Sequence, residues 1–214
     1  MALKYLLQAF VAAILVCAPD LSRGQAFDEL LKAVFKGDAK TVVAYLDQGL
    51  DPNTADPAGN TLLMTAARLG YQELVALLIE RKASVTRRSP HSDTALMYAS
   101  LKGHLGIAKL LIEKGAPVSH DGWAPLHYAA FEGRAEMAKF LLERGADKNA
   151  VAPNGYSALM LAAIGGHLEA ARALLYEDVD VTVKGPKGET ALGSAKERRD
   201  GPLVDLLQRA GAVE

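Results

Sequence analysis

Histidine is the residue type in this sequence best suited to acid–base chemistry or metal binding near neutral pH. None of the histidines belongs to an HExxH or CxxC motif, and no Ser-His-Asp or Cys-His combination can be assigned. The glycines recur at regular intervals and do not form a phosphate-binding loop. We therefore expect no catalytic site, no metal and no cofactor. The histidines are His91, His104, His120, His127 and His167.

The amino-acid composition excludes further classes of function. The chain has 24 Lys and Arg against 25 Asp and Glu, so it lacks the general positive field that attracts nucleic acid. Cys17 is the only cysteine, which excludes a disulfide framework and leaves a structural zinc site without thiolate ligands. The class of function that remains is the binding of a partner on the protein surface. Trp123 is the only tryptophan, and tryptophan is enriched at binding hot spots.

The elements that position these residues follow one repeated pattern. In the stretch from Trp123 to Asp147, Ala124-Pro125-Leu126-His127 opens a short apolar segment, Gly133 follows, and Gly145 closes a second apolar segment. This order predicts a helix, a tight turn, a second helix and a stop. The leucines of the pattern are spaced by 33, 30, 33 and 33 residues. The pattern comprises Leu63, Leu96, Leu126, Leu159 and Leu192, an alanine three places after each leucine, and Gly37, Gly70, Gly103, Gly133 and Gly166.

A 33-residue period with a motif close to T-P-L-H-x-A is typical of ankyrin repeats. The chain resembles the ankyrin-repeat family from about Phe27 to its last residue. The resemblance implies an all-α repeat solenoid of helix-turn-helix pairs with β-turn fingers. We predict an N-terminal capping repeat over 27–55, full repeats over 56–88, 89–118, 119–151 and 152–184, and a C-terminal capping repeat over 185–214.

The repeats depart from regularity in three ways. Lys82 and Asp178 stand where other repeats have a helix-ending glycine, so we expect left-handed backbone there. Three residues are missing between Gly115 and Gly122, which predicts a shortened finger and a notch in the row of fingers. Ala124 stands where Thr61, Thr94 and Thr190 offer a capping hydroxyl.

The first 26 residues do not share the pattern, and we predict that 1–26 is a signal peptide. Lys4 precedes an apolar run from Leu6 to Ala18, which is too short to span a bilayer but suits an export signal. Small residues before Phe27 favour cleavage after Ala26. An uncleaved membrane anchor is the alternative. The signal resembles that of bacterial secreted ankyrin proteins, so we expect a periplasmic location, with membrane contact only through the signal peptide.

The resemblance also implies where a partner binds. Finger tips and the exposed positions of the first helix of each repeat line a concave face in ankyrin arrays. We expect Trp123, Phe131 and Tyr156 to border one notch. For Tyr128 and Phe131 the alternative is packing between repeats. The expected partner-binding residues are His91, Leu101, Trp123, Tyr128, Phe131, Tyr156 and Ile164.

These observations predict a non-catalytic protein–protein interaction module, monomeric and binding a partner protein. The resemblance implies that His127 hydrogen-bonds neighbouring loops, and we expect structural roles for His104 and His167. The second hypothesis is an accessory protein that carries haem or a metal for a periplasmic enzyme. That hypothesis requires His120 or His127 to converge with other ligands at the notch.

Overall fold

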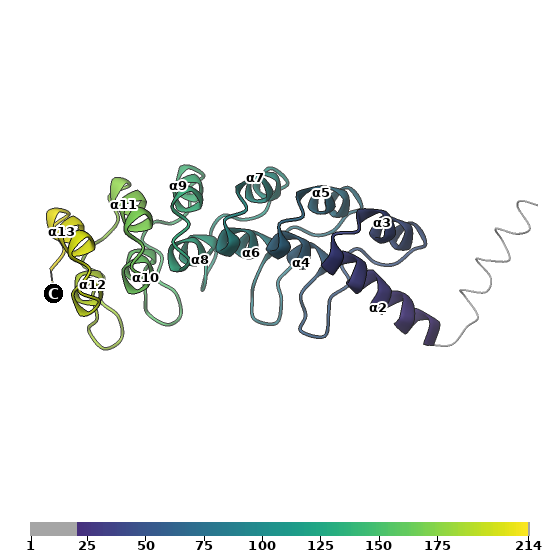
Figure 1. The fold of residues 1–214 in the computed structure, drawn as a ribbon, viewed down its shortest axis with the longest axis horizontal. Helices are drawn as coiled ribbons and strands as arrows, with labels where there is room; N and C mark the ends of the chain where they lie inside the picture. The colour runs from purple at the N-terminus through teal and green to yellow at the C-terminus, as the bar shows by residue number, and fades with distance from the viewer. Residues whose placement is uncertain (1–20, 214) are drawn as a thin grey trace, which may run out of the picture.

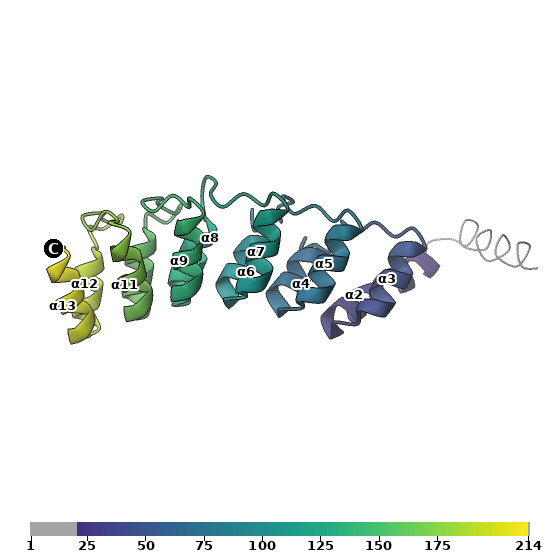
Figure 2. The same ribbon diagram turned by 90° about the horizontal axis from the view of Figure 1, so that it is seen from above.

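Two parallel rows of helices form the molecule, stacked in chain order (Figure 1). The computed structural model describes residues 21–213, and this part of the chain folds into helix pairs without a strand. Seen from above, the stack is elongated and gently arched (Figure 2). The inner row contains α2 (Leu21–Lys36), α4 (Leu62–Leu69), α6 (Ala95–Lys102), α8 (Pro125–Phe131), α10 (Ala158–Gly165) and α12 (Ala191–Glu197). The outer row contains α3 (Ala39–Asp47), α5 (Gln72–Glu80), α7 (Leu105–Glu113), α9 (Ala135–Glu143), α11 (Leu168–Tyr176) and α13 (Gly201–Arg209).

The leucines and alanines of the repeat form the core between neighbouring pairs. Leu126 and Leu159 are each 2% exposed, and the other three leucines of the pattern are buried to the same degree. Each alanine three places later is fully buried, because the inner helices approach too closely there for a larger side chain. The all-α repeat solenoid that the resemblance implies is therefore confirmed.

Hydroxyl side chains start most of the inner helices. Thr61 Oγ1 accepts the backbone N–H of Met64, and Thr94 Oγ1 accepts that of Met97. Ala124 makes no such bond, as the sequence predicts. Pro125 follows at the first helical position, where it removes one N–H that would otherwise need a partner.

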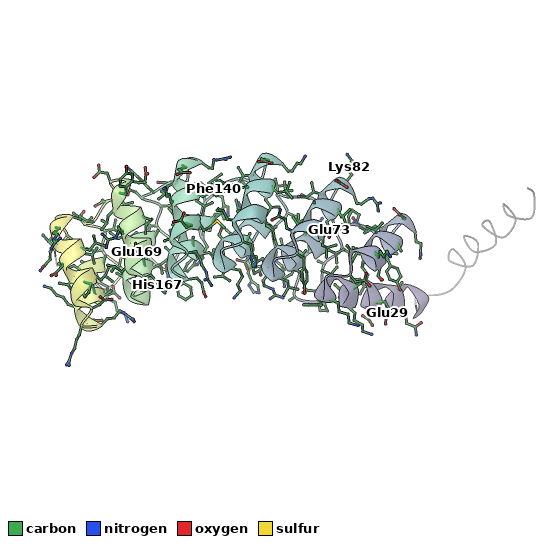
Figure 3. The ribbon with its side chains drawn as sticks, turned by 45° about the horizontal axis from the view of Figure 1, so that its top comes forward. Glu29, Glu73, Lys82, Phe140, His167 and Glu169 are labelled. Atoms are coloured by element: carbon green, nitrogen blue, oxygen red, sulfur yellow. The ribbon has the colours of Figure 1, made fainter. Side chains whose placement is uncertain are left out.

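A ladder of side-chain hydrogen bonds joins each repeat to the one before it. A donor beside the turn between the two helices reaches back to a backbone carbonyl in the last turn of the preceding inner helix. Gly70 is needed at this turn, because a Cβ there would lie 2.7 Å from the His104 ring. The predicted structural roles of His104 and His167 are confirmed (Figure 3). The rungs are Tyr71–Phe35 (3.2 Å), His104–Arg68 (3.3 Å), Arg134–Leu101 (3.2 Å), His167–Phe131 (3.0 Å) and Arg198–Ile164 (3.1 Å).

Non-glycine residues end two of the outer helices in left-handed backbone, as predicted. Lys82 follows α5 with φ 69°, and Asp178 follows α11 with φ 56°. Arg199 also has positive φ, at 57°, and occupies the turn position that is glycine in the other repeats. Arg199 is not among the predicted left-handed residues, because the glycine series from Gly37 to Gly166 was not continued into the C-terminal capping repeat.

Lys82→Gly should stabilise the protein by up to about 1 kcal/mol, because glycine adopts positive φ without a Cβ clash. Lys82 is exposed at the end of α5, so the substitution removes no buried contact (Figure 3). Denaturant melts of the variant and the parent measure the change. A neutral or destabilising result would show that the left-handed strain at Lys82 is relieved by something other than the backbone.

Among the fingers of the described chain, the one leading into α8 differs from the other four. Each of the other four is closed by two backbone hydrogen bonds, such as Asp56 N to Asn60 O and Gly59 N to Asp56 O. Neither equivalent bond forms between Ser119 and Trp123. Figure 1 shows this finger as the shortest of the row, which confirms the predicted loss of length.

The N-terminal prediction falls largely outside the described residues. The apolar run Leu6–Ala18 belongs to residues 1–20, which the structure does not describe. Helix α2 begins at Leu21 and runs through the predicted cleavage point after Ala26. Within residues 25–36 of α2, whose burial is described, the buried residues are Leu30, Ala33 and Val34. Within residues 21–213, every helix is too short or too polar to cross a bilayer.

Candidate functional site

Exposed apolar side chains recur at one position of the inner helices, two residues before the glycine of the turn. Phe131 is 49% exposed, Phe35 46% and Ile164 38%, and Leu101 at the same position is half-buried. These residues lie in the last turns of α8, α2, α10 and α6. Large apolar side chains left in water at a repeated position form a surface that a binding partner can cover, and Arg68 is the residue at this position in α4.

A small apolar hollow interrupts this surface between α6 and α8. Leu101, Trp123, Tyr128 and Phe131 line it, and its volume is about 130 Å³. The Trp123 ring centre lies 5.6 Å from that of Tyr128 and 5.8 Å from that of His127. Trp123 is therefore held half-buried at the base of the short finger, so it forms a fixed wall of the hollow.

Hydrogen bonds to the preceding finger fix the position of Tyr128. The hydroxyl of Tyr128 donates to Asp93 Oδ1 at 2.5 Å. At the equivalent position one repeat earlier, the hydroxyl of Tyr98 donates to Asn60 Oδ1 at 2.8 Å. Burial, together with the bond to Asp93, raises the pKa of Tyr128, so its hydroxyl stays protonated at neutral pH. Both alternatives considered for Tyr128 therefore apply. Its hydroxyl connects two repeats, and its ring lines the hollow where a partner could bind.

His127 lies fully buried behind Trp123 and uses both ring nitrogens inside the fold. Nδ1 accepts the backbone N–H of Ala124 at 3.0 Å, so Nε2 carries the proton and donates to Ala150 O at 2.9 Å. This arrangement requires a neutral ring, and burial lowers the pKa of His127 below its ordinary value. The implied bond from His127 to a neighbouring loop is confirmed.

A family model for ankyrin repeats, in three copies, matches residues 30–120, 82–152 and 145–212. The chain belongs to the ankyrin-repeat family. No curated protein matches it. Ankyrin repeats generally mediate interactions between proteins, and proteins built from them are typically non-catalytic.

The ankyrin array separates some of the residues that we expected to border one notch. Tyr156 does not border the hollow: its hydroxyl donates to Glu189 Oε1 at 3.0 Å, in the following finger. This corrects the expectation that Trp123, Phe131 and Tyr156 share one notch. Ile164 lies one repeat further along in α10, and His91 lies exposed at a finger tip. The structure therefore brings together four of the seven expected partner-binding residues.

Phe35 belongs to this ankyrin surface although the sequence reading did not select it. It stands two residues before Gly37, the position that Leu101, Phe131 and Ile164 occupy in later repeats. Aligning the capping repeat at its glycine would have identified Phe35. Phe35 lies in the N-terminal capping repeat, whereas all the expected partner-binding residues lie in full repeats.

His127→Met should make the stability of the array less dependent on pH. Methionine occupies the equivalent place at Met64, Met97 and Met160. The folded-state pKa of His127 is lowered, so its contribution to stability is fully present above the ordinary pKa of 6.5 and is lost as pH falls below it. Between about pH 7 and pH 5 we expect the parent to lose up to about 1.4 kcal/mol per pH unit more than the variant. Parallel pH profiles of the melting temperature would contradict this.

Proposed function

We propose that this chain is a non-catalytic protein-binding module that holds a partner protein on the surface around the hollow. The observation that carries the proposal is the set of exposed apolar side chains on the inner helices, with a rigid aromatic hollow between α6 and α8. The hollow, at about 130 Å³, is smaller than the roughly 300–1,000 Å³ typical of small-molecule sites, so it suits one side chain of a partner. The array acts as a monomer in this proposal.

Variants of the surface test the proposal by affinity capture from an extract of the source cells. The parent, Phe131→Ser and Tyr176→Ala are immobilised in parallel. Tyr176 is the matched control, because it is an aromatic residue 85% exposed on the outer helix α11. A genuine partner should be captured by the parent and by Tyr176→Ala and lost with Phe131→Ser. Equal capture by all three proteins would overturn the proposed surface.

Export to the periplasm is part of the proposal. It is supported by the apolar run Leu6–Ala18 and by the small residues before Phe27. N-terminal sequencing of the protein from its source should begin at or near Phe27. An intact chain starting at Met1 in the soluble cytoplasmic fraction would refute export, and an intact chain in the membrane fraction would indicate an anchor.

No observation favours the alternative of a haem or metal carrier. Both nitrogens of His127 are engaged inside the fold, and His120 Nδ1 lies 2.9 Å from the carbonyl of Asp121. Within residues 21–213, no three His, Cys, Asp or Glu side chains gather as a metal site requires. An absorption spectrum and the metal content of the purified protein test this alternative directly.

A further inference from the structure

The inner helices differ in whether their last turn carries a basic residue. The last turns of α2, α4 and α6 carry Lys36, Arg68 and Lys102, and that of α12 carries Lys196, whereas α8 and α10 carry no basic residue there. Every inner helix has the same dipole, which favours a cation near its C-terminus. The dipole alone therefore does not explain why α8 and α10, which expose Phe131 and Ile164, lack a cation. Lys36, Arg68 and Lys102 are the three cations on the N-terminal side of the hollow.

Within the described residues, these three cations have no carboxylate within ion-pair distance. The Arg68 guanidinium stacks over the Tyr98 ring, with 5.8 Å from Cζ to the ring centre, which leaves its charge unneutralised. Four acidic side chains of this surface are hydrogen-bonded or ion-paired within the fold. Asp56 binds Asn60, Asp93 binds Tyr98 and Tyr128, Glu132 pairs with Arg134, and Glu189 binds Tyr156.

We infer that the partner presents an acidic segment, with one bulky apolar side chain in the hollow and its carboxylates over α6 and α4. This inference rests on the proposed function and specifies the chemistry of the partner. Charge complementarity carries it, because Lys102 directly follows Leu101, which lines the hollow, Arg68 lies in the neighbouring helix α4, and neither cation is in an ion pair. A basic or uncharged segment would leave Arg68 and Lys102 without a counter-charge.

The spacing of the helices sets the spacing of the acidic residues. Packed helices lie about 8–10 Å apart. An extended chain advances about 3.3 Å per residue. One repeat therefore corresponds to about three residues of the bound segment. We expect one acidic residue beside the apolar anchor, facing Lys102, and a second about three residues further away, facing Arg68.

Selection from a displayed library of short random peptides tests the inference. The full array is the bait, and Arg68→Gln/Lys102→Gln serves for counter-selection. Lys114→Gln is the matched control, because Lys114 is an exposed lysine that caps the outer helix α7 and has no ion-pair partner. Thermal melts check that each variant is folded. Enriched peptides should combine an aromatic or large aliphatic residue with acidic residues on one side of it.

A synthetic peptide of an enriched sequence, made without tryptophan, is then titrated while the fluorescence of Trp123 is followed. Trp123 is the only tryptophan and lines the hollow, so its emission reports occupancy. Each of Arg68→Gln and Lys102→Gln should weaken binding by about two- to fivefold, and added salt should do the same. Lys114→Gln should leave affinity unchanged.

Two outcomes overturn the inference, and they differ in what they mean for the proposed function. Enrichment of neutral or basic peptides that still change Trp123 emission would refute the acidic partner and leave the proposed binding surface standing. Failure to enrich any peptide would count against both. Tighter binding of a single-stranded oligonucleotide than of the acidic peptide, lost in Arg68→Gln/Lys102→Gln, would assign the cations to nucleic acid instead.

Discussion

Leu126→Ala should cost the array about 2–5 kcal/mol of unfolding free energy, the range measured for large-to-small changes in packed cores. Leu126 is 2% exposed and belongs to α8, which packs against α6 on one side and α10 on the other. Removing three carbon atoms there leaves a cavity that two flanking helices cannot both close. Chemical denaturation of the parent and the variant, followed by circular dichroism, gives the difference.

Leu159→Ala provides the matched second site, since Leu159 is equally buried one repeat further along. Each repeat contacts mainly its neighbours, so a weakened central repeat should also broaden the unfolding transition. A cost below about half a kilocalorie at both positions would contradict the continuous core and the stacking derived from it.

Trp123→Ala should weaken partner binding by about 2 kcal/mol or more, which is the hot-spot range for a buried aromatic anchor. Trp123 forms one wall of the hollow, and its ring is already held against His127 and Tyr128. Little conformational entropy is therefore lost when a partner contacts it. Titration of the identified partner against the parent and the variant measures the loss.

The controls for Trp123→Ala separate binding from folding. We expect a smaller loss of stability than for Leu126→Ala, because Trp123 is only half-buried. Tyr176→Ala, which removes an aromatic residue from the outer row, should leave partner binding unchanged. If Trp123→Ala binds as well as the parent, or loses binding only in proportion to its unfolded fraction, the hollow is structural and the interface lies elsewhere.

The fold was predictable because its information is local and periodic. One leucine, one alanine and one glycine per repeat set the helix pair, and the left-handed backbone at Lys82 followed from the glycines at equivalent places. The shortened finger before Gly122 followed from counting residues. Each of these features depends on positions within one repeat, so aligning the repeats reveals it.

The site was predictable only in part, because its contacts join residues of different repeats. The bond from Tyr128 to Asp93 spans 35 residues, and that from Tyr156 to Glu189 spans 33. The two tyrosines occupy different positions of the repeat. Tyr128 lies two residues after Leu126, as Tyr98 does after Leu96, and both turn toward the preceding finger, whereas Tyr156 lies three residues before Leu159 and turns toward the following finger. The partner of Tyr156 lies in another repeat, so the sequence did not show that Tyr156 is held away from the hollow.

In the ladder of hydrogen bonds between repeats, only the donor is a specific side chain. A phenol, an imidazole or a guanidinium reaches back, and the acceptor is in every case a main-chain carbonyl, which any residue provides. These bonds therefore make no demand on the side chain of the acceptor residue, and only the glycine of the preceding turn, such as Gly70, must stay small. The side chains of Phe35, Arg68, Leu101, Phe131 and Ile164 are thus free to vary for binding while the bonds between repeats stay the same.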